Sequence, residues 1–172
     1  MILRMVIHVA VGELAQLTVD AIVNPTNSLG MMVSGISATI REVGGAAIED
    51  EAKASAPIAV GAAVVTTGGD LFAKSVIHVP TMEEPGMKIG VENVRRATRA
   101  ALLAAARFNH ATIAYPVIGT GPGGVPFDEA ARAMVDELRA HKQPMPTTVY
   151  LIASRIEQVP PFEEALRLAS QP

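Results

Sequence analysis

Apolar and polar positions along the chain follow two alternating periods. Short runs rich in Val and Ile, bounded by Gly, Pro, Asp or Asn, predict β-strands. Between these runs, apolar residues recur with the spacing of amphipathic helices. The predicted strands are Leu3–Val9, Ala21–Val23, Ala62–Thr66, Ser75–Val79, Thr112–Ile118 and Thr148–Ala153. The predicted helices are Ile36–Ala54 with an interruption near Gly44 and Gly45, Val91–Asn109, Asp128–His141, and one after Pro161. This alternation predicts a layered α/β fold with right-handed crossovers.

One strand-to-helix connection has an unusual composition. The strand Thr112–Ile118 ends at a loop with glycines at positions 119, 121, 123 and 124, and a helix begins near Phe127 or Asp128. Glycine lets the backbone approach a ligand closely, and consecutive N–H groups in such a turn converge on one point. The helix start adds partial positive charge. An ordinary turn explains two glycines rather than four, so this loop predicts a phosphate-bearing ligand.

A second loop, Asn24–Gly35, also follows a predicted strand. Ligands of open α/β sheets bind beyond the carboxyl ends of the strands, which is where both loops lie. Asn24 can turn the chain through side-chain-to-backbone hydrogen bonds. Asn27 lies deeper in the loop, where its carboxamide offers both a donor and an acceptor to a sugar.

Composition narrows the function classes. The sequence is 49% hydrophobic and 3% aromatic, which suits buried parallel strands covered by Ala-rich helices. Its length is typical of one domain, spanning residues 1–172. No apolar run approaches the ~20 residues of a membrane span. The absence of cysteine excludes thiolate metal sites and a cysteine nucleophile, and it is compatible with the cytoplasm, where we expect the protein. The histidines form no metal-ligand pattern, and a net charge of −3 without a basic run argues against nucleic acid.

Several segments in the same order resemble the macrodomain family of ADP-ribose-binding modules. Gly12-Glu13-Leu14 is similar to the family's Gly-Asp-Ile, and Val19–Ser28 is similar to its Val-Asp-Ala-Ile-Val-Asn-Ala-Ala-Asn. The other matching segments are Gly35–Ile40, at the start of the family's first helix, Val76-Ile77-His78, in its Val-Ile-His strand, and Gly119–Pro126, its second ligand loop. The resemblance implies a three-layer α/β/α sandwich with a central mixed, mostly parallel sheet of about six strands.

The resemblance also assigns site residues. It implies that Glu13 accepts from the adenine amino group, that the Leu14 N–H meets the ring, and that Asn27 is catalytic and binds the terminal ribose. Backbone N–H groups of both loops hold the diphosphate. The implied ligand-binding residues are Glu13, Leu14, Asn24, Val33, Ser34, Gly35, Ile36, Gly119, Thr120, Gly121, Pro122, Gly123, Gly124 and Ser154. The implied partner is ADP-ribose or an ADP-ribosylated protein, with no cofactor and no metal; the oligomeric state is open.

The chain departs from the family pattern at several positions. Glu13 replaces Asp, and Met31–Ser34 replaces several glycines. Ser37 stands where hydrolytic branches often carry an acidic residue, which argues for a slow enzyme. Gly123 replaces an aromatic over the terminal ribose, so we expect a more open mouth. Ala153-Ser154-Arg155 replaces the frequent aromatic that stacks on adenine, and Arg155 either stacks there through its guanidinium face or is a solvated arginine. We expect His78 to be buried with a backbone hydrogen-bond partner.

Three functions follow from these patterns. The first is ADP-ribose binding with slow hydrolysis at the terminal ribose of an ADP-ribosylated protein, O-acetyl-ADP-ribose or ADP-ribose 1″-phosphate. The second is a reader module without turnover. The third is an NAD(P)-dependent oxidoreductase, because residues 119–124 match Gly-x-Gly-x-x-Gly. That fingerprint normally follows the first strand, with an acidic residue ~20 positions on at a strand end. Here the spacing reaches Asp136 and Glu137 inside a predicted helix.

Overall fold

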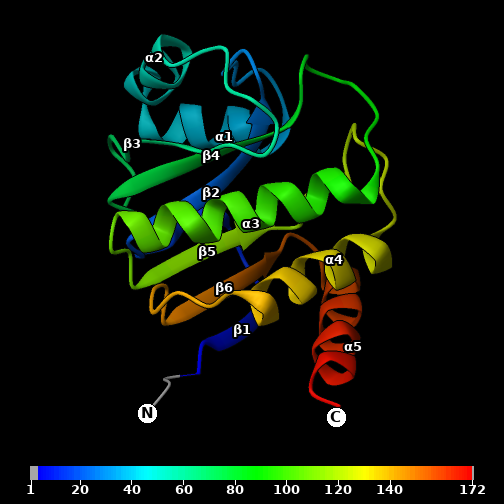
Figure 1. Cartoon of the computed structure of the whole chain (residues 1–172). Coiled ribbons are helices and arrows are strands. Elements are labelled where there is room, and N and C mark those ends of the chain that lie inside the picture. Colours follow the sequence, from blue (N-terminus) through cyan, green and yellow to red (C-terminus); the bar gives the residue numbers. More distant parts are fainter. Residues whose placement is uncertain (1–3, 172) are drawn as a thin grey trace.

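Successive residues of the central strand β2 (Ala21–Asn27) belong to different apolar clusters, because side chains along a strand point alternately to opposite faces. Val23 belongs to the apolar cluster that includes residues of helices α3, α4 and α5, whereas Ile22 belongs to the cluster that includes residues of α1 and α2. The helices are α1 (Gly35–Gly44), α2 (Ala46–Ala54), α3 (Val91–Arg107), α4 (Phe127–Ala140) and α5 (Val159–Ala169). The computed structural model describes residues 4–171 and shows three layers (Figure 1).

The sheet has six strands in the order β1-β6-β5-β2-β4-β3. All neighbouring pairs are parallel except β3 and β4, which are antiparallel. The remaining bounds are β1 (Val6–Val11), β3 (Val64–Thr67), β4 (Ser75–Met82), β5 (Thr112–Pro116) and β6 (Thr148–Ala153). The predicted three-layer α/β/α sandwich with a mixed, mostly parallel sheet is confirmed.

The sheet opens between β2 and β5. In the described chain these strands pair at Ala21–Ile113 and Ile22–Ala114 and no further, whereas β2 follows β4 as far as Asn27. From β2 the chain continues to the β4 side, and from β5 it continues to the β6 side. Neighbouring strands whose connections leave in opposite directions define a switch point, where open α/β sheets bind ligands beyond the carboxyl ends.

Most predicted elements are present within a few residues of their expected bounds. The helix predicted over Ile36–Ala54 is interrupted at Gly45, as expected, which takes a φ of +99° and separates α1 from α2. The first strand begins at Val6 and ends at Val11; Leu3, the start of the predicted strand, lies outside the described residues. Two 3-10 helices were not predicted: η1 (Leu14–Gln16) and η2 (Ile156–Gln158).

Strand β2 is longer than predicted because it runs through Pro25 to Asn27. Proline is tolerated in a strand where one side has no ladder to complete. Pro25 lies beyond the last pair with β5, so β2 has a neighbour only on its β4 side there. The strand therefore carries Asn24 and Asn27, which a turn interpretation places in a loop.

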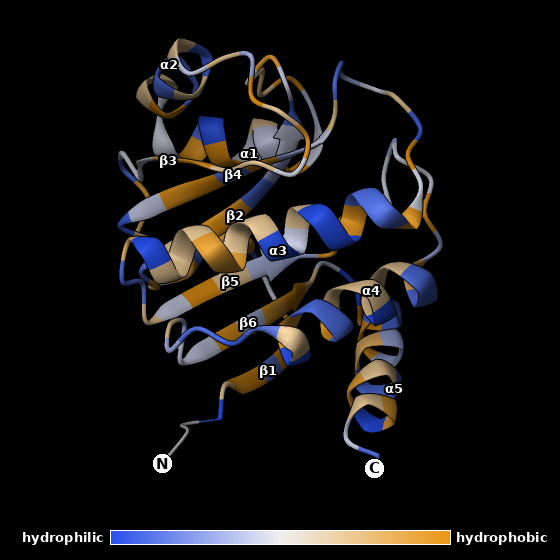
Figure 2. Cartoon of the chain, viewed as in Figure 1, coloured by the Kyte–Doolittle hydropathy of each residue, from blue (hydrophilic) through white to orange (hydrophobic). Residues whose placement is uncertain are grey.

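Apolar and polar residues separate across the layers (Figure 2). Helix α3 is joined to α4 by two ion pairs on its polar side, Arg95–Asp136 at 3.1 Å and Arg99–Glu137 at 2.8 Å. Within residues 4–171, none of the helices has the length and hydrophobicity that a membrane crossing requires. The sheet edge at the carboxyl ends of β2, β4 and β5 is where the loops leave the layers.

Candidate functional site

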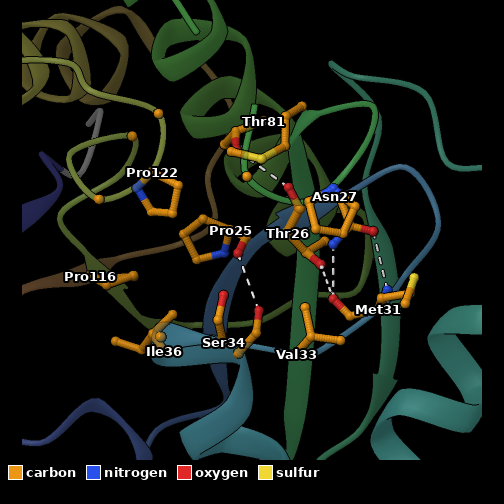
Figure 3. Close-up of a pocket in the computed structure, with 18 of the residues that line it drawn as sticks. Pro25, Thr26, Asn27, Met31, Val33, Ser34, Ile36, Thr81, Pro116 and Pro122 are labelled. Carbon is orange, nitrogen blue, oxygen red and sulfur yellow. Dashed lines mark hydrogen bonds between the residues drawn. The ribbon is translucent and has the colours of Figure 1, made fainter. Parts of the chain in front are cut away.

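A cavity of about 360 Å³ lies where β2 and β5 separate (Figure 3). Its wall comes from the ends of three strands and from three loops. The lining residues are Pro25, Thr26, Asn27, Met31, Val33, Ser34, Gly35, Ile36, Ser37, Thr81, Met82, Pro85, Gly86, Pro116, Val117, Gly119, Gly121, Pro122 and Gly123. The two loops predicted from the sequence therefore meet at one cavity.

The glycine-rich loop after β5 is a tight turn. Its shape is set by hydrogen bonds from Val125 N to Gly119 O at 2.9 Å and from Gly124 N to Gly121 O at 3.1 Å. Gly119 has a φ of +82°, a conformation that side-chain-bearing residues rarely adopt. Within the described chain, the N–H groups of Thr120, Gly121 and Gly123 donate to no protein acceptor. These main-chain donors are available to an anion.

The opposite loop is held by the carboxamide of Asn27. Its Oδ1 accepts from the N–H groups of Leu29 and Met31 at 3.1 and 3.2 Å, and its Nδ2 donates to Met31 O at 2.9 Å. These bonds close the turn that returns the chain to the cavity (Figure 3). Asn27 lines the cavity, with one Nδ2 hydrogen left for a ligand.

A buried carboxylate fixes the same loop from behind. Glu49 Oε2 accepts from Met32 N, and Glu49 Oε1 pairs with Arg41 Nε at 3.0 Å and Lys53 Nζ at 3.4 Å. Burial opposes ionisation of this group. The Met32 N–H and the charges of Lys53 and Arg41 outweigh it, so the pKa of Glu49 lies below its usual value. Helix α2 thereby holds the segment that leads into α1.

The start of α1 supplies a second group of main-chain donors. The first N–H groups of a helix have no partner within it, and the cap residue Ser34 makes no side-chain cap bond. Among the described residues, no hydrogen bond to protein is made by the N–H groups of Val33, Ser34, Gly35 and Ile36. The partial positive charge of a helix start favours an anion here.

The described lining contains no Asp, Glu, His, Lys, Arg, Cys or Tyr. An anion in the cavity would therefore meet amide dipoles rather than charged side chains. The described wall also contains no ionisable side chain that faces the cavity alongside these amides. Ser37, which stands where hydrolytic branches often carry an acidic residue, lies in the wall.

The residues predicted to meet adenine lie on the neighbouring part of the rim. Strands β1 and β6 pair to their ends, at Val11–Ala153, which brings Glu13 and Leu14 close to Ser154. These three are outside the cavity lining. The N–H and Oγ of Ser154 both bond Gln158 Oε1, at 2.7 and 3.2 Å. The Arg155 guanidinium lies 5.9 Å from the Phe127 ring centroid, so a cation–π pair stands beside this part of the rim.

The structure brings nine of the predicted residues into the cavity wall: Asn27, Val33, Ser34, Gly35, Ile36, Gly119, Gly121, Pro122 and Gly123. Glu13, Leu14, Asn24, Thr120, Gly124 and Ser154 are not in it, and their ligand contacts stay predictions. Sequence reasoning assigned no role to Thr81, Met82, Pro85 and Gly86, which lie at and after the end of β4. The turn-forming segment Glu83–Gly86 is the sequence feature from which this side of the cavity could have been predicted.

Beneath the cavity lies a buried row of polar side chains. Ser37 Oγ bonds Asn24 Oδ1 at 2.7 Å, Asn24 Nδ2 lies 3.1 Å from His78 Nδ1, and His78 Nε2 lies 2.8 Å from Thr66 Oγ1. His78 is buried, as expected, but the expected backbone partner is wrong. Its two ring nitrogens instead lie within hydrogen-bond distance of the side chains of Asn24 and Thr66, which belong to the neighbouring strands β2 and β3. Burial lowers the pKa of His78 to about 4.

Comparison with known proteins identifies the family. The Macro domain model matches residues 23–134, more than half of the chain. An uncharacterized protein of Aquifex aeolicus is 47% identical over 162 residues, covering 94% of this chain and 98% of that protein. A Macro domain-containing protein of Methanosarcina mazei is 31% identical over 163 residues, covering 93% and 87%. The chain therefore belongs to the Macro domain family, and the resemblance read from its motifs is confirmed.

Solved macrodomain structures share the fold. A Trypanosoma brucei macrodomain in complex with ADP-ribose matches with a TM-score of 0.82 and 22% identity, over 93% of this chain and 68% of that one. An Oceanobacillus iheyensis macrodomain with ADP matches with a TM-score of 0.81 and 20% identity, over 93% and 89%. At these identities the likeness establishes the arrangement of helices and strands.

Proposed function

We propose that this protein binds ADP-ribose, free or attached to a protein, and holds the diphosphate between two loops through main-chain N–H groups. The observation that carries the proposal is the cavity at the β2–β5 opening. In the described chain it is bordered by N–H groups without a protein acceptor, those of Val33–Ile36 and of Thr120, Gly121 and Gly123, and its described wall has no ionisable side chain. Structural relatives described as complexes with ADP-ribose and with ADP agree with this ligand class.

The three parts of the ligand are proposed to lie along the rim. The diphosphate lies between Gly35 and Gly121, where the α1 dipole and the glycine loop face one cavity. The terminal ribose lies near Asn27, whose remaining Nδ2 hydrogen is a donor to a sugar oxygen. Adenine lies toward Glu13 and Leu14, beside the Arg155–Phe127 pair.

A reader role is favoured over rapid turnover. A hydrolase needs a group that moves a proton, and no lining residue of the described wall has an acidic or basic side chain. Hydrolysis of an ADP-ribosylated protein, O-acetyl-ADP-ribose or ADP-ribose 1″-phosphate would depend on a water held by the ligand's own phosphate. Positioning by Asn27 and the two loops can contribute up to ~7–11 kcal/mol in favourable cases. We expect such hydrolysis to be slow, and we expect its rate not to depend on the protonation of any side chain in the described wall.

Calorimetry with ADP-ribose, AMP and NAD tests the ligand class. The proposal requires ADP-ribose to bind at least tenfold more tightly than AMP, a difference of about 1.4 kcal/mol, because AMP lacks the second phosphate and the terminal ribose. A preference for NAD would favour a dinucleotide enzyme instead. Release of ADP-ribose from a modified protein then separates the reader from the hydrolase, since a reader gives no release above buffer while its binding persists.

We propose the location and the domain organisation from the sequence alone. We infer a cytoplasmic protein from the cysteine-free composition, and one domain over residues 1–172 from its length. Fractionation of cells that express a tagged protein tests the first inference, and a single cooperative unfolding transition tests the second.

A further inference from the structure

The buried polar row begins at the cavity and runs sideways under helix α1. Asn24 and His78 are register partners on β2 and β4, and Thr66 lies on the adjoining strand β3. Asn24 and His78 are fully buried, and Ser37 and Thr66 are 7% and 5% exposed. Ser37 alone among the four lines the cavity. The direction in which hydrogens are donated along this row therefore decides what the Ser37 hydroxyl offers to a ligand.

Two directions of donation satisfy the central histidine, and they differ at both ends. In the first, Ser37 donates to Asn24 Oδ1, Asn24 Nδ2 donates to His78 Nδ1, and His78 Nε2–H donates to Thr66 Oγ1. The Thr66 hydroxyl is then free to donate to Thr67 O at 3.1 Å. Both hydroxyls, the His78 Nε2–H and one hydrogen of the Asn24 Nδ2 group then each have an acceptor within 3.1 Å.

The second direction is weaker. The Thr66 hydroxyl would donate to His78 and would therefore lose its own bond to Thr67 O. The Asn24 amide would turn its Nδ2 toward Ser37. The Ser37 hydrogen would then depend on Pro25 O, at 3.4 Å, beyond the usual range of a good O–H···O bond. The first direction replaces that contact with the 2.7 Å bond to Asn24 Oδ1. Burial lowers the pKa of His78 to about 4, so the ring is neutral at pH 7, as both directions need.

We propose that Ser37 is a specificity-determining residue whose oxygen faces the cavity purely as a hydrogen-bond acceptor. Its hydrogen is committed to Asn24, so its lone pairs select a ligand donor such as a sugar hydroxyl. An anionic oxygen at the same place meets no donor from Ser37 and is disfavoured. His78 and Thr66 act as positioning residues, because they fix the orientation of the Asn24 amide. The ligand assignment rests on the proposed ADP-ribose function, whereas the direction of donation does not.

The direction of donation is measurable in the unliganded wild-type protein. Nitrogen-15 spectra of the histidine rings distinguish a protonated from an unprotonated ring nitrogen. The proposal requires His78 to carry its hydrogen on Nε2 and to keep this neutral form from pH 8 to about pH 5, since burial brings its pKa to about 4. An Nδ1–H tautomer requires the Asn24 amide to donate to Ser37 and overturns the proposal.

Binding measurements test the consequence for the ligand. Calorimetry compares ADP-ribose with ADP, which lacks the terminal ribose, for the wild type, Ser37→Ala and the distant control Ser170→Ala. Loss of one accepted hydrogen bond predicts that Ser37→Ala binds ADP-ribose about two- to tenfold more weakly, with ADP unchanged. An equal change for both ligands, or no change for either, overturns the role of Ser37. Failure of the wild type to bind either nucleotide refutes the proposed function instead, and the histidine tautomer still tests the row.

Discussion

Ile89 occupies the space that a side chain at Gly123 would need. A Cβ atom at position 123 would lie 2.8 Å from Ile89 Cγ1 and 2.8 Å from Gly119 O, and Ile89 N donates to Gly123 O at 3.0 Å. The loop after β4 is thereby joined to the glycine loop. Ile89 thereby fills the space beside Gly123, and the more open mouth expected from the missing aromatic at position 123 stays a prediction.

Gly123→Ala is therefore expected to strain this junction. The added methyl has no room, and overpacking of this kind costs about 1–3 kcal/mol. Thermal or denaturant unfolding measures the loss. Gly121→Ala is the matched control, because a Cβ at that position of the same loop meets no atom within 4 Å. Equal stabilities of the two variants would show that Ile89 does not fill the space.

Glu49→Gln is expected to destabilise the protein at pH 7. The substitution removes the ion pairs with Arg41 and Lys53 and weakens the bond from Met32, which predicts a loss of about 1.5–3 kcal/mol, the range of hydrogen bonds to charged groups. Because the pKa of Glu49 is lowered in the folded state, its contribution is complete above the unfolded-state pKa of about 4.3. It is lost as pH falls through the folded-state value.

Denaturant unfolding of wild type and Glu49→Gln at several pH values checks this. The gap between them should be widest at neutral pH and shrink below pH ~4.3. Glu42→Gln, an exposed carboxylate on the neighbouring helix, is the control and should leave stability within about 0.5 kcal/mol of wild type. A gap that persists or widens in acid would contradict the assigned state of Glu49.

Asn27→Ala is expected to lower stability as well as affinity. The carboxamide makes three bonds to the turn at Leu29–Met31, and leaving buried partners unsatisfied costs about 1–3 kcal/mol. Unfolding and ADP-ribose binding should be measured on the same preparations. A variant as stable as the wild type would assign Asn27 to ligand contact alone. Loss of turnover in this variant is therefore interpretable only beside its measured affinity.

The salt dependence of binding is expected to be shallow. The described cavity wall has no Lys or Arg, so the diphosphate displaces few counterions from the protein. The log–log slope of the ADP-ribose association constant against salt concentration should be below about 1, whereas proteins that neutralise several phosphates with cations show slopes of several units. Calorimetry between low and moderate salt gives the slope. A steep one would indicate cationic side chains at the ligand.

The elements could be predicted because local signals agree with tertiary structure. Strand β6 has the predicted bounds Thr148–Ala153, since its β-branched run and flanking residues are all local information. The end of β2 could not be predicted in this way. Pro25 and Asn27 have turn chemistry, and they continue a strand because β5 has already diverged from that side of the sheet.

The site was predicted in part for the same reason. Glycines at 119, 121 and 123 predict a ligand loop from local sequence alone. The hydrogen-bond partners of Ser37 and His78 instead depend on the register between strands β2 and β4. Asn24 and His78 are 54 positions apart and meet because β2 and β4 pair Asn24 with His78. The wall from Thr81 to Gly86 depends on where β4 ends, which single-sequence patterns place poorly.

The central claim, that main-chain amides of two loops hold the diphosphate, is tested most directly by amide spectra recorded during titration with ADP-ribose. We expect the largest amide shifts at Val33–Ile36 and at Thr120, Gly121 and Gly123, and the same loops to respond to ADP. Shifts confined to other surfaces, or responses from only one of the two loops, would contradict it.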